Sequence, residues 1–184
     1  MPFDADAAAA PGSGIFGLPF TEKDSKIVLV PVPFDATTSY RRGTARGPAA
    51  ILDASMQVDL FDRRFGRVYE RGICMLKEPA RIRRLSREAG KAAEPVIAEG
   101  GAPEGGKVPK SMAKSIKKVN DACQAVNEWV YGEVARILKN GKVPGVVGGE
   151  HSVPFGAIEA VADEFEEIGV LHVDAHMDLR REFE

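Results

Sequence analysis

A short apolar run at residues 27–32 constrains the fold more than any other feature of this sequence. The run is rich in β-branched residues, follows Lys26 and is closed by Pro33. An apolar run without polar alternation is typical of a strand that is buried on both faces, and such strands belong to parallel sheets covered by helices. We therefore expect a central parallel strand at this position.

Further strands and helices alternate along the chain. Pro48 suits the first turn of a helix after the first strand. Apolar residues recur every three or four positions from 112 to 140, which predicts a long amphipathic helix. Apolar runs at 143–147 and 169–173 predict two more strands, with a helix at 153–167 between them. This alternation indicates an α/β fold with a parallel sheet.

Two segments do not share this alternation. Residues 1–24 are rich in Ala, Gly and Pro with little periodicity, and we expect a flexible arm or an interface segment there. Residues 77–111 join a basic stretch to a Gly- and Pro-rich turn sequence, which we interpret as a surface insertion. A chain of 184 residues, 44% of them hydrophobic, is long enough for the core of one domain.

Charge and cysteine content narrow the class of partner and the compartment. The 25 basic and 27 acidic side chains leave a formal charge of -2, which gives no electrostatic case for nucleic acid or an anionic membrane. Cys74 and Cys123 lie far apart without metal-binding spacing, as is typical of a reducing compartment. No stretch reaches the roughly 18 apolar residues of a membrane span. We expect a cytoplasmic protein with a small-molecule partner.

Residue types that bind metals follow the apolar run at 169–173. In an extended chain the side chains of Asp174, His176 and Asp178 share one face, so two carboxylates and an imidazole converge. Because no basic residue follows until Arg180, this negative charge is costly to bury unless a cation neutralises it. A single histidine beside a strand is usually a core or surface residue, so His172 stays outside the expected ligand set.

A second group follows the run at 143–147. Gly148 and Gly149 allow a close approach of backbone, and His151 begins the next turn, where it can add a fourth ligand. We expect Glu150 and Ser152 to support the ligands or to cap a helix rather than to bind the metal. Carboxylates with imidazole favour Mn(II), while Zn, Fe, Co and Ni remain alternatives.

With these residues in view, the chain resembles the ureohydrolase family, which includes arginases, agmatinases, guanidinobutyrases and formiminoglutamases. The family's first metal motif, G-G-D-H-S, corresponds to residues 148–152, where Glu150 replaces the commoner Asp. The second motif, D-A-H-x-D, corresponds to residues 174–178. The two motifs occur in the family's order and at its spacing.

Other segments are similar to the agmatinase branch of that family. These are Pro33-Phe34-Asp35, Thr38-Ser39-Tyr40-Arg41, Arg46-Gly47-Pro48 and Asp178-Leu179-Arg180. The resemblance places Asp35 near the rim of the site, beside Glu150 and Ser152. It favours agmatinase over arginase.

The resemblance implies an arginase-like three-layer α/β/α sandwich with a parallel sheet and a centre of two Mn2+ ions. In that family pattern His151, Asp174 and Asp178 bind one ion, His176 binds the other, and Asp174 bridges them. The implied reaction is hydrolysis of the guanidino group of agmatine, or of a related guanidino compound, to an amine (putrescine from agmatine) and urea. The implied assembly is a homo-oligomer. No catalytic residue is assigned beyond the metal centre.

The family's third metal motif, a D-x-D pair, and a later substrate-facing His and Glu have no counterpart within residues 1–184. We therefore interpret the chain as the amino-terminal part of a single ureohydrolase domain, truncated within its sheet. Two alternatives remain open. One is a non-catalytic truncated homologue or one half of a split enzyme. The other is a metal-dependent deacylase of arginase-like fold, against which the spacing of the two metal motifs argues.

Overall fold

Three parallel strands form the sheet of this protein, in the order β2-β1-β3. A computed structural model describes residues 3–5, 7–10, 12–38, 40–101 and 108–178. The central strand β1 (Ile27–Val32) pairs with β2 (Ile73–Met75) on one side and with β3 (Val143–Gly148) on the other. Because the strands are parallel, the segments that follow β1 and β3 both leave the sheet at the carboxyl ends of the strands. The expected α/β class and parallel sheet are confirmed.

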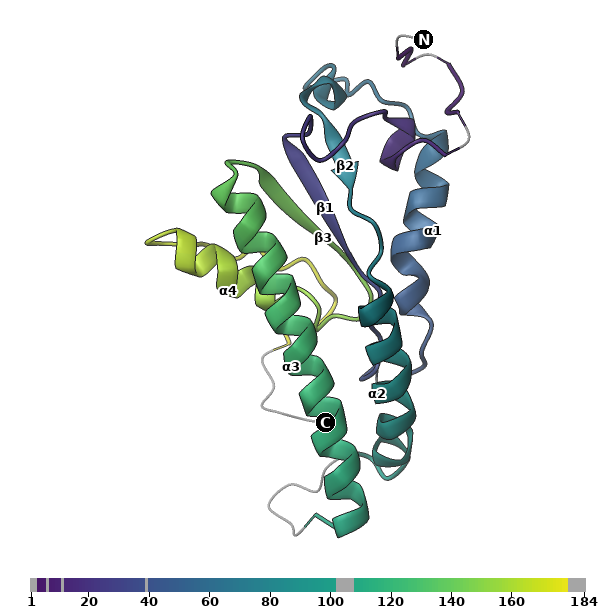
Figure 1. The fold of residues 1–184 in the computed structure, drawn as a ribbon, viewed down its shortest axis with the longest axis vertical. Coiled ribbons are helices and arrows are strands. Elements are labelled where there is room, and N and C mark those ends of the chain that lie inside the picture. The colour runs from purple at the N-terminus through teal and green to yellow at the C-terminus, as the bar shows by residue number, and fades with distance from the viewer. Residues whose placement is uncertain (1–2, 6, 11, 39, 102–107, 179–184) are drawn as a thin grey trace.

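Helices flank the strands on both sides in Figure 1, with α1 on the right and α3 and α4 on the left. The predicted helices are confirmed, with ends that differ by a few residues at most. The α-helices are α1 (Gly47–Ala54), α2 (Ala80–Ala98), α3 (Lys110–Lys139) and α4 (Phe155–Glu164). Short 3-10 turns are η1 (Ile15–Gly17), η2 (Thr44–Arg46), η3 (Ser55–Gln57) and η4 (Val68–Arg71).

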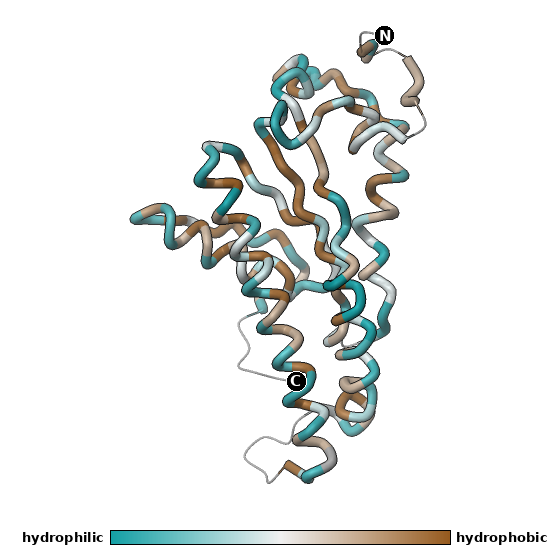
Figure 2. The backbone as a smooth tube through the Cα atoms, in the orientation of Figure 1, coloured by the Kyte–Doolittle hydropathy of each residue, from teal (hydrophilic) through white to brown (hydrophobic). Residues whose placement is uncertain are grey.

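The core lies between β1 and the long helix α3. Val28, Val30 and Val32 alternate along β1 and are fully buried, and Val130 and Val134 of α3 are equally buried against the same cluster. Burial of an aliphatic side chain of this kind contributes about 1.5–3 kcal/mol. Figure 2 shows mostly apolar strands and helices of mixed colour, as expected when each helix covers the sheet with one face. None of the described helices is long and apolar enough to cross a membrane.

The stretch expected to be a surface insertion contributes instead to the core. Residues 80–98 form α2, which packs against α3. The buried residues of α2 recur at helical spacing and are Ile82, Ser86, Ala89, Gly90, Ala93 and Val96. The arginines that make the segment look like a surface stretch fall between these positions. Residues 102–107, in the Gly-rich part of the stretch, lie outside the described residues.

The expectation of a flexible arm at residues 1–24 fails at residues 15–18. Ile15 and Leu18 are buried, and the backbone N–H of Phe16 donates to Ser55 Oγ at 2.9 Å. These contacts tie η1 to η3, at the end of α1. A segment poor in periodic pattern is therefore ordered here by tertiary contacts.

The expected third strand at 169–173 is wrong for the described residues, which contain no strand there. Val170, Leu171 and Val173 are exposed. An apolar strand of this kind requires a hydrogen-bonded neighbour and cover on both faces. Within the part of the chain that the structure describes, β3 is an edge strand and nothing covers this segment, which lines an open apolar groove of about 290 Å³ beside β3 and α4.

Candidate metal centre

Four side chains with metal-binding atoms gather beside the carboxyl end of β3. Their ligand atoms all lie within 4.8 Å of one another, and the residues are His151, His172, Asp174 and Asp178. His151 belongs to the turn that joins β3 to α4, whereas the other three belong to the segment that follows α4. Two imidazoles and two carboxylates form a donor set that suits a divalent first-row transition metal.

The histidines of this group lie against its carboxylates. His151 Nδ1 is 2.7 Å from Asp178 Oδ2 and 3.9 Å from Asp174 Oδ2. His172 Nε2 is 3.8 Å from Asp178 Oδ2, and the His151 and His172 ring centroids are 5.2 Å apart. Asp178 has a left-handed backbone, with φ 50°, which aspartate tolerates better than most residues. The donors therefore already converge on a common space.

His176 lies beside this group rather than in it. Its backbone N–H donates to Asp174 Oδ1 at 2.8 Å, and its ring Nδ1 is 3.2 Å from the same oxygen. The hydrogen bond from the His176 N–H is the main cause that lowers the pKa of Asp174, opposed by slight burial and assisted by the His176, His151 and His172 rings. Asp174 is consequently a carboxylate at neutral pH, as metal binding requires.

The structure brings together three of the four ligands expected from the sequence: His151, Asp174 and Asp178. It adds His172, which the sequence interpretation had left out, and it does not include His176. A signal for His172 was available, because it precedes Asp174 by two residues and so shares a face with Asp174 and Asp178 in an extended chain. Ser39, Leu179 and Arg180, which carried part of the resemblance, lie outside the described residues.

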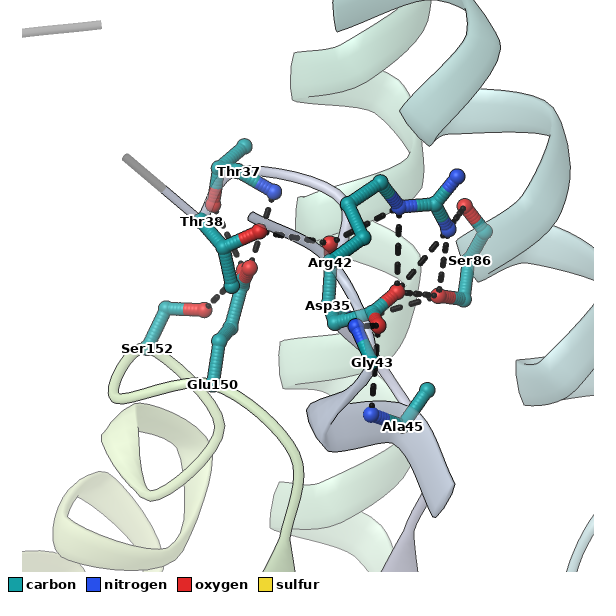
Figure 3. A network of polar contacts seen from close by, with 9 residues as sticks. All are labelled: Asp35, Thr37, Thr38, Arg42, Gly43, Ala45, Ser86, Glu150 and Ser152. Atoms are coloured by element: carbon teal, nitrogen blue, oxygen red, sulfur yellow. Dashed lines mark hydrogen bonds and ion pairs between the residues drawn. The ribbon is translucent and has the colours of Figure 1, made fainter. Parts of the chain in front are cut away.

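Glu150 joins the turn after β3 to the loop after β1. Its Oε2 accepts the backbone N–H of Thr37 at 2.8 Å, and its Oε1 accepts the hydroxyls of Thr37 at 2.5 Å and Ser152 at 2.8 Å (Figure 3). The Glu150 backbone N–H donates to the carbonyl of Phe34 at 2.8 Å. Glu150 and Ser152 thus contact the scaffold and each other rather than the group of metal-binding side chains.

The backbone at position 149 requires glycine. Its φ is +79°, and a Cβ there would lie 2.3 Å from the carbonyl oxygen of Phe34 and 2.6 Å from that of Val32. No other residue fits such an approach without moving the backbone. The paired glycines therefore allow the turn that carries His151 to lie directly on the end of β1.

Asp35 lies at the centre of a second network in the same loop. Its carboxylate accepts Arg42 Nη2 at 2.8 Å, Ser86 Oγ at 2.9 Å and the backbone N–H groups of Gly43 at 2.7 Å and Ala45 at 3.2 Å (Figure 3). Burial by itself raises the pKa of Asp35, but these donors, Gly43 and Arg42 foremost, lower it overall. Asp35 therefore fastens the loop after β1 to α2 and is not one of the clustered metal-binding residues.

Thr37, Arg42 and Ser86 are the residues of these networks that the sequence interpretation missed. Thr37 contacts a residue 113 positions away, and Ser86 one 51 positions away. No local sequence pattern predicts such contacts, because they depend on how β1, α2 and β3 pack.

A family model described as the arginase family matches residues 25–184. The N(1)-aminopropylagmatine ureohydrolase of Synechocystis sp. is 29% identical over 164 residues, which cover 88% of this chain and 43% of that protein. The agmatinase of Bacillus anthracis is 25% identical over 162 residues, again 88% and 43% of the two chains. The crystal structure of agmatine ureohydrolase of Thermoplasma volcanium aligns with a TM-score of 0.47 at 21% identity, covering 77% of this chain and 36% of that one.

The matched range contains both motifs that carry the candidate metal ligands, and it covers most of the chain. The chain spans less than half of the length of the curated relatives named above. The resemblance drawn from the two motifs is confirmed by the family match. This chain belongs to the arginase family.

Proposed function

We propose that His151, Asp174, His176 and Asp178 are this chain's contribution to a centre of two Mn2+ ions. We further propose that the protein hydrolyses the guanidino group of agmatine, or of a related compound, to an amine and urea. The observation that carries this proposal is the position of Asp174. Its Oδ2 faces His151 at 3.9 Å, while its Oδ1 faces His176 at 3.2 Å.

A carboxylate with its two oxygens directed at two different imidazoles has the arrangement needed to bridge two cations. His151 and Asp178 provide further donors on the Oδ2 side of Asp174. Divalent cations held by these residues would polarise the substrate as Lewis acids and would lower the pKa of a bound water. The imidazole and carboxylate donors fit Mn2+, as they also fit Zn2+, Fe2+ and Co2+.

Asp174 and Asp178 are two carboxylates at the surface, and bound cations would neutralise their charge. The proposed substrate class is therefore supported by the relatives and not by the charge of these side chains. The names of the relatives, agmatinase and N(1)-aminopropylagmatine ureohydrolase, support a guanidino compound with a second amine at its far end.

The test is urea release with Mn2+ from three substrates supplied separately: agmatine, N(1)-aminopropylagmatine and 4-guanidinobutanoate. We expect turnover of one of the two amine-bearing compounds, loss of turnover in His151→Ala and Asp174→Asn, and retention in Ser25→Ala. Ser25 is a suitable control because it is buried at the opposite end of β1, where its hydroxyl donates to the carbonyl of Thr21 at 2.8 Å. Turnover that persists in both ligand variants would refute the assigned centre.

A second candidate function is metal binding that requires a complementing polypeptide for turnover. The exposure of the donors favours it, because His151, His172, Asp174 and Asp178 are all exposed in this structure. An active metal centre is normally enclosed by the protein that holds it. Stoichiometric Mn2+ binding without urea release, followed by turnover when the missing half of a relative is added as a separate chain, would establish this candidate. Urea release by the chain alone would exclude it.

A further inference from the structure

We propose that Glu150 is a positioning residue that holds His151 at the metal centre by clamping the turn after β3 to Thr37. The proposal rests on the proposed function only for the role of His151 as a ligand. The clamp itself consists of contacts that can be measured without a metal. The proposal gives a structural role to Glu150, which stands where the family motif has Asp.

The local environment makes His151 dependent on its neighbours. His151 is exposed, but it stands between Glu150 and Val153, which are 8% and 4% exposed. Its ring contacts His172, Asp174 and Asp178, which all belong to the segment after α4. The attachment of His151 to the sheet therefore runs through the buried residues on either side of it, and Glu150 is the polar one.

The carboxylate of Glu150 depends on its hydrogen bonds. Among the described residues, its side-chain partners are neutral: the Thr37 N–H, the Thr37 hydroxyl and the Ser152 hydroxyl. A buried carboxylate without a cationic partner is tolerated only when such donors surround it. Movement of the turn away from Thr37 would remove the two hydrogen bonds from Thr37 to a buried side chain, so these contacts oppose separation of the two segments.

Thr37 is itself held in place from the other side. Asp35, two residues earlier, is fixed by Ser86 of α2 and by Arg42. The loop after β1 is thus anchored to α2 at Asp35 and presents Thr37 to Glu150 (Figure 3). These contacts connect α2, through the loop after β1, to the turn that carries His151.

The length of the Glu150 side chain matches this partner. Its two oxygens reach the N–H and the hydroxyl of one residue, Thr37, across the gap between the two loops. Aspartate is shorter by one methylene, about 1.5 Å of reach, and cannot make both contacts without moving the turn. Glutamine keeps the reach: its oxygen can accept the Thr37 N–H while its amide donates to the two hydroxyl oxygens. The proposal therefore concerns reach and hydrogen bonding, not charge.

The experiment measures Mn2+ affinity through loss of the electron paramagnetic resonance signal of free aqueous Mn2+. We expect Glu150→Asp and Thr37→Val to weaken Mn2+ binding by about 10- to 100-fold, the range found when partners of metal ligands are removed. Glu150→Gln and Thr37→Ser should bind close to the wild-type value, since both keep the contacts. Ser25→Ala is the matched control for loss of a buried hydroxyl far from the site.

Two results would overturn the clamp. One is wild-type affinity in both Glu150→Asp and Thr37→Val. The other is a loss in Glu150→Gln as large as that in Glu150→Asp, which would assign the effect to charge instead.

Failure of the proposed metal centre is distinguishable from failure of the clamp. If the wild-type chain binds no Mn2+, the centre is refuted, and the clamp is judged by hydrogen exchange of the Thr37 amide in the metal-free protein. Faster exchange in Glu150→Asp than in Glu150→Gln would support the clamp. Equal exchange in the wild type and both variants would refute it.

Discussion

Replacement of Gly90 by alanine tests whether Arg42 is fixed over α2 as the structure shows. A Cβ at position 90 would lie 2.1 Å from Arg42 Cζ and 2.2 Å from Nη1. A free arginine would simply swing away. This one is held by Asp35, with Nη2 2.8 Å from Oδ1, and by the carbonyl of Ser86 at 2.9 Å. Gly90→Ala should therefore displace the guanidinium and break its pairing with Asp35, a residue that is 3% exposed.

The expected magnitude follows from two opposing effects. Alanine in place of glycine inside a helix stabilises by about 0.5–1 kcal/mol. Loss of hydrogen bonds to a charged group costs about 1.5–3 kcal/mol. The lower part of that range applies, because the Arg42 side chain is 30% exposed and Asp35 keeps the donors from Gly43, Ala45 and Ser86. The net change should be a destabilisation of about 1 kcal/mol, rising toward 2 kcal/mol if Arg42 finds no new partner.

The assay is urea denaturation followed by circular dichroism, with Gly132→Ala as the matched control. Gly132 lies inside α3, and nothing is within 4 Å of its Cβ position, so this substitution should stabilise by about 0.5–1 kcal/mol. In an Arg42→Ala background the clash disappears, and Gly90→Ala should then stabilise as Gly132→Ala does. An unchanged penalty for Gly90→Ala in that background would refute the reasoning, because the clash with Arg42 could not be its cause.

Because the folded protein lowers the pKa of Asp35 from its ordinary value of 3.8, the ionised Asp35 stabilises the fold at pH values above 3.8, and this stabilisation is lost as the pH falls through the pKa of the folded state. The unfolding free energies of the wild type and Asp35→Asn should therefore converge in acid. A gap that stays constant with pH would contradict this. Burial, assisted by the charge of Glu150, raises the pKa of Cys123 to about 11, so iodoacetamide at pH 8 should label it far more slowly than a free cysteine, as mass spectrometry can show. His176→Ala should lower the number of Mn2+ ions bound per chain while His172→Ala leaves it unchanged, and the reverse result would exchange their roles.

The parts of the fold that were predictable are those with a complete local signal. The periodic stretch at 112–140 matches α3 to within two residues at each end, because periodicity over many residues is a strong helical signal. The run at 27–32 coincides with β1, which has a paired strand on either side. The helix α2 was missed because arginines interrupt its apolar stripe in the linear sequence. The run at 169–173 carries the signal of a buried strand, but a strand forms only when a neighbour and cover are present.

The candidate site also contains residues with a local sequence signal and residues whose contacts depend on tertiary packing. His151 could be found because it follows β3, and a parallel sheet gathers ligands at the carboxyl ends of its strands. Asp174 could be found from the spacing of the Asp and His residues at 174–178, although no strand precedes it among the described residues. The contacts that fasten these residues, from Glu150 to Thr37 and from Asp35 to Ser86, join loops and helices distant in sequence. Their partners are determined by packing. Glu150 was expected to support the ligands because it lies beside His151, whereas only the resemblance to a family pointed to Asp35.

The exchange of His172 for His176 among the gathered donors has a local cause. Alternation puts His172, Asp174, His176 and Asp178 on one face only while the chain is extended. In the structure Asp174 Oδ1 accepts the N–H of His176, a side-chain to backbone contact across two residues that bends the chain. The bend keeps His176 beside Asp174 but turns its ring outward, with 81% of the side chain exposed. The same bend leaves the two oxygens of Asp174 facing two different imidazoles, with Oδ2 toward His151 and Oδ1 toward His176. The bridging role proposed for Asp174 therefore rests on the bent segment and not on alternation along an extended strand.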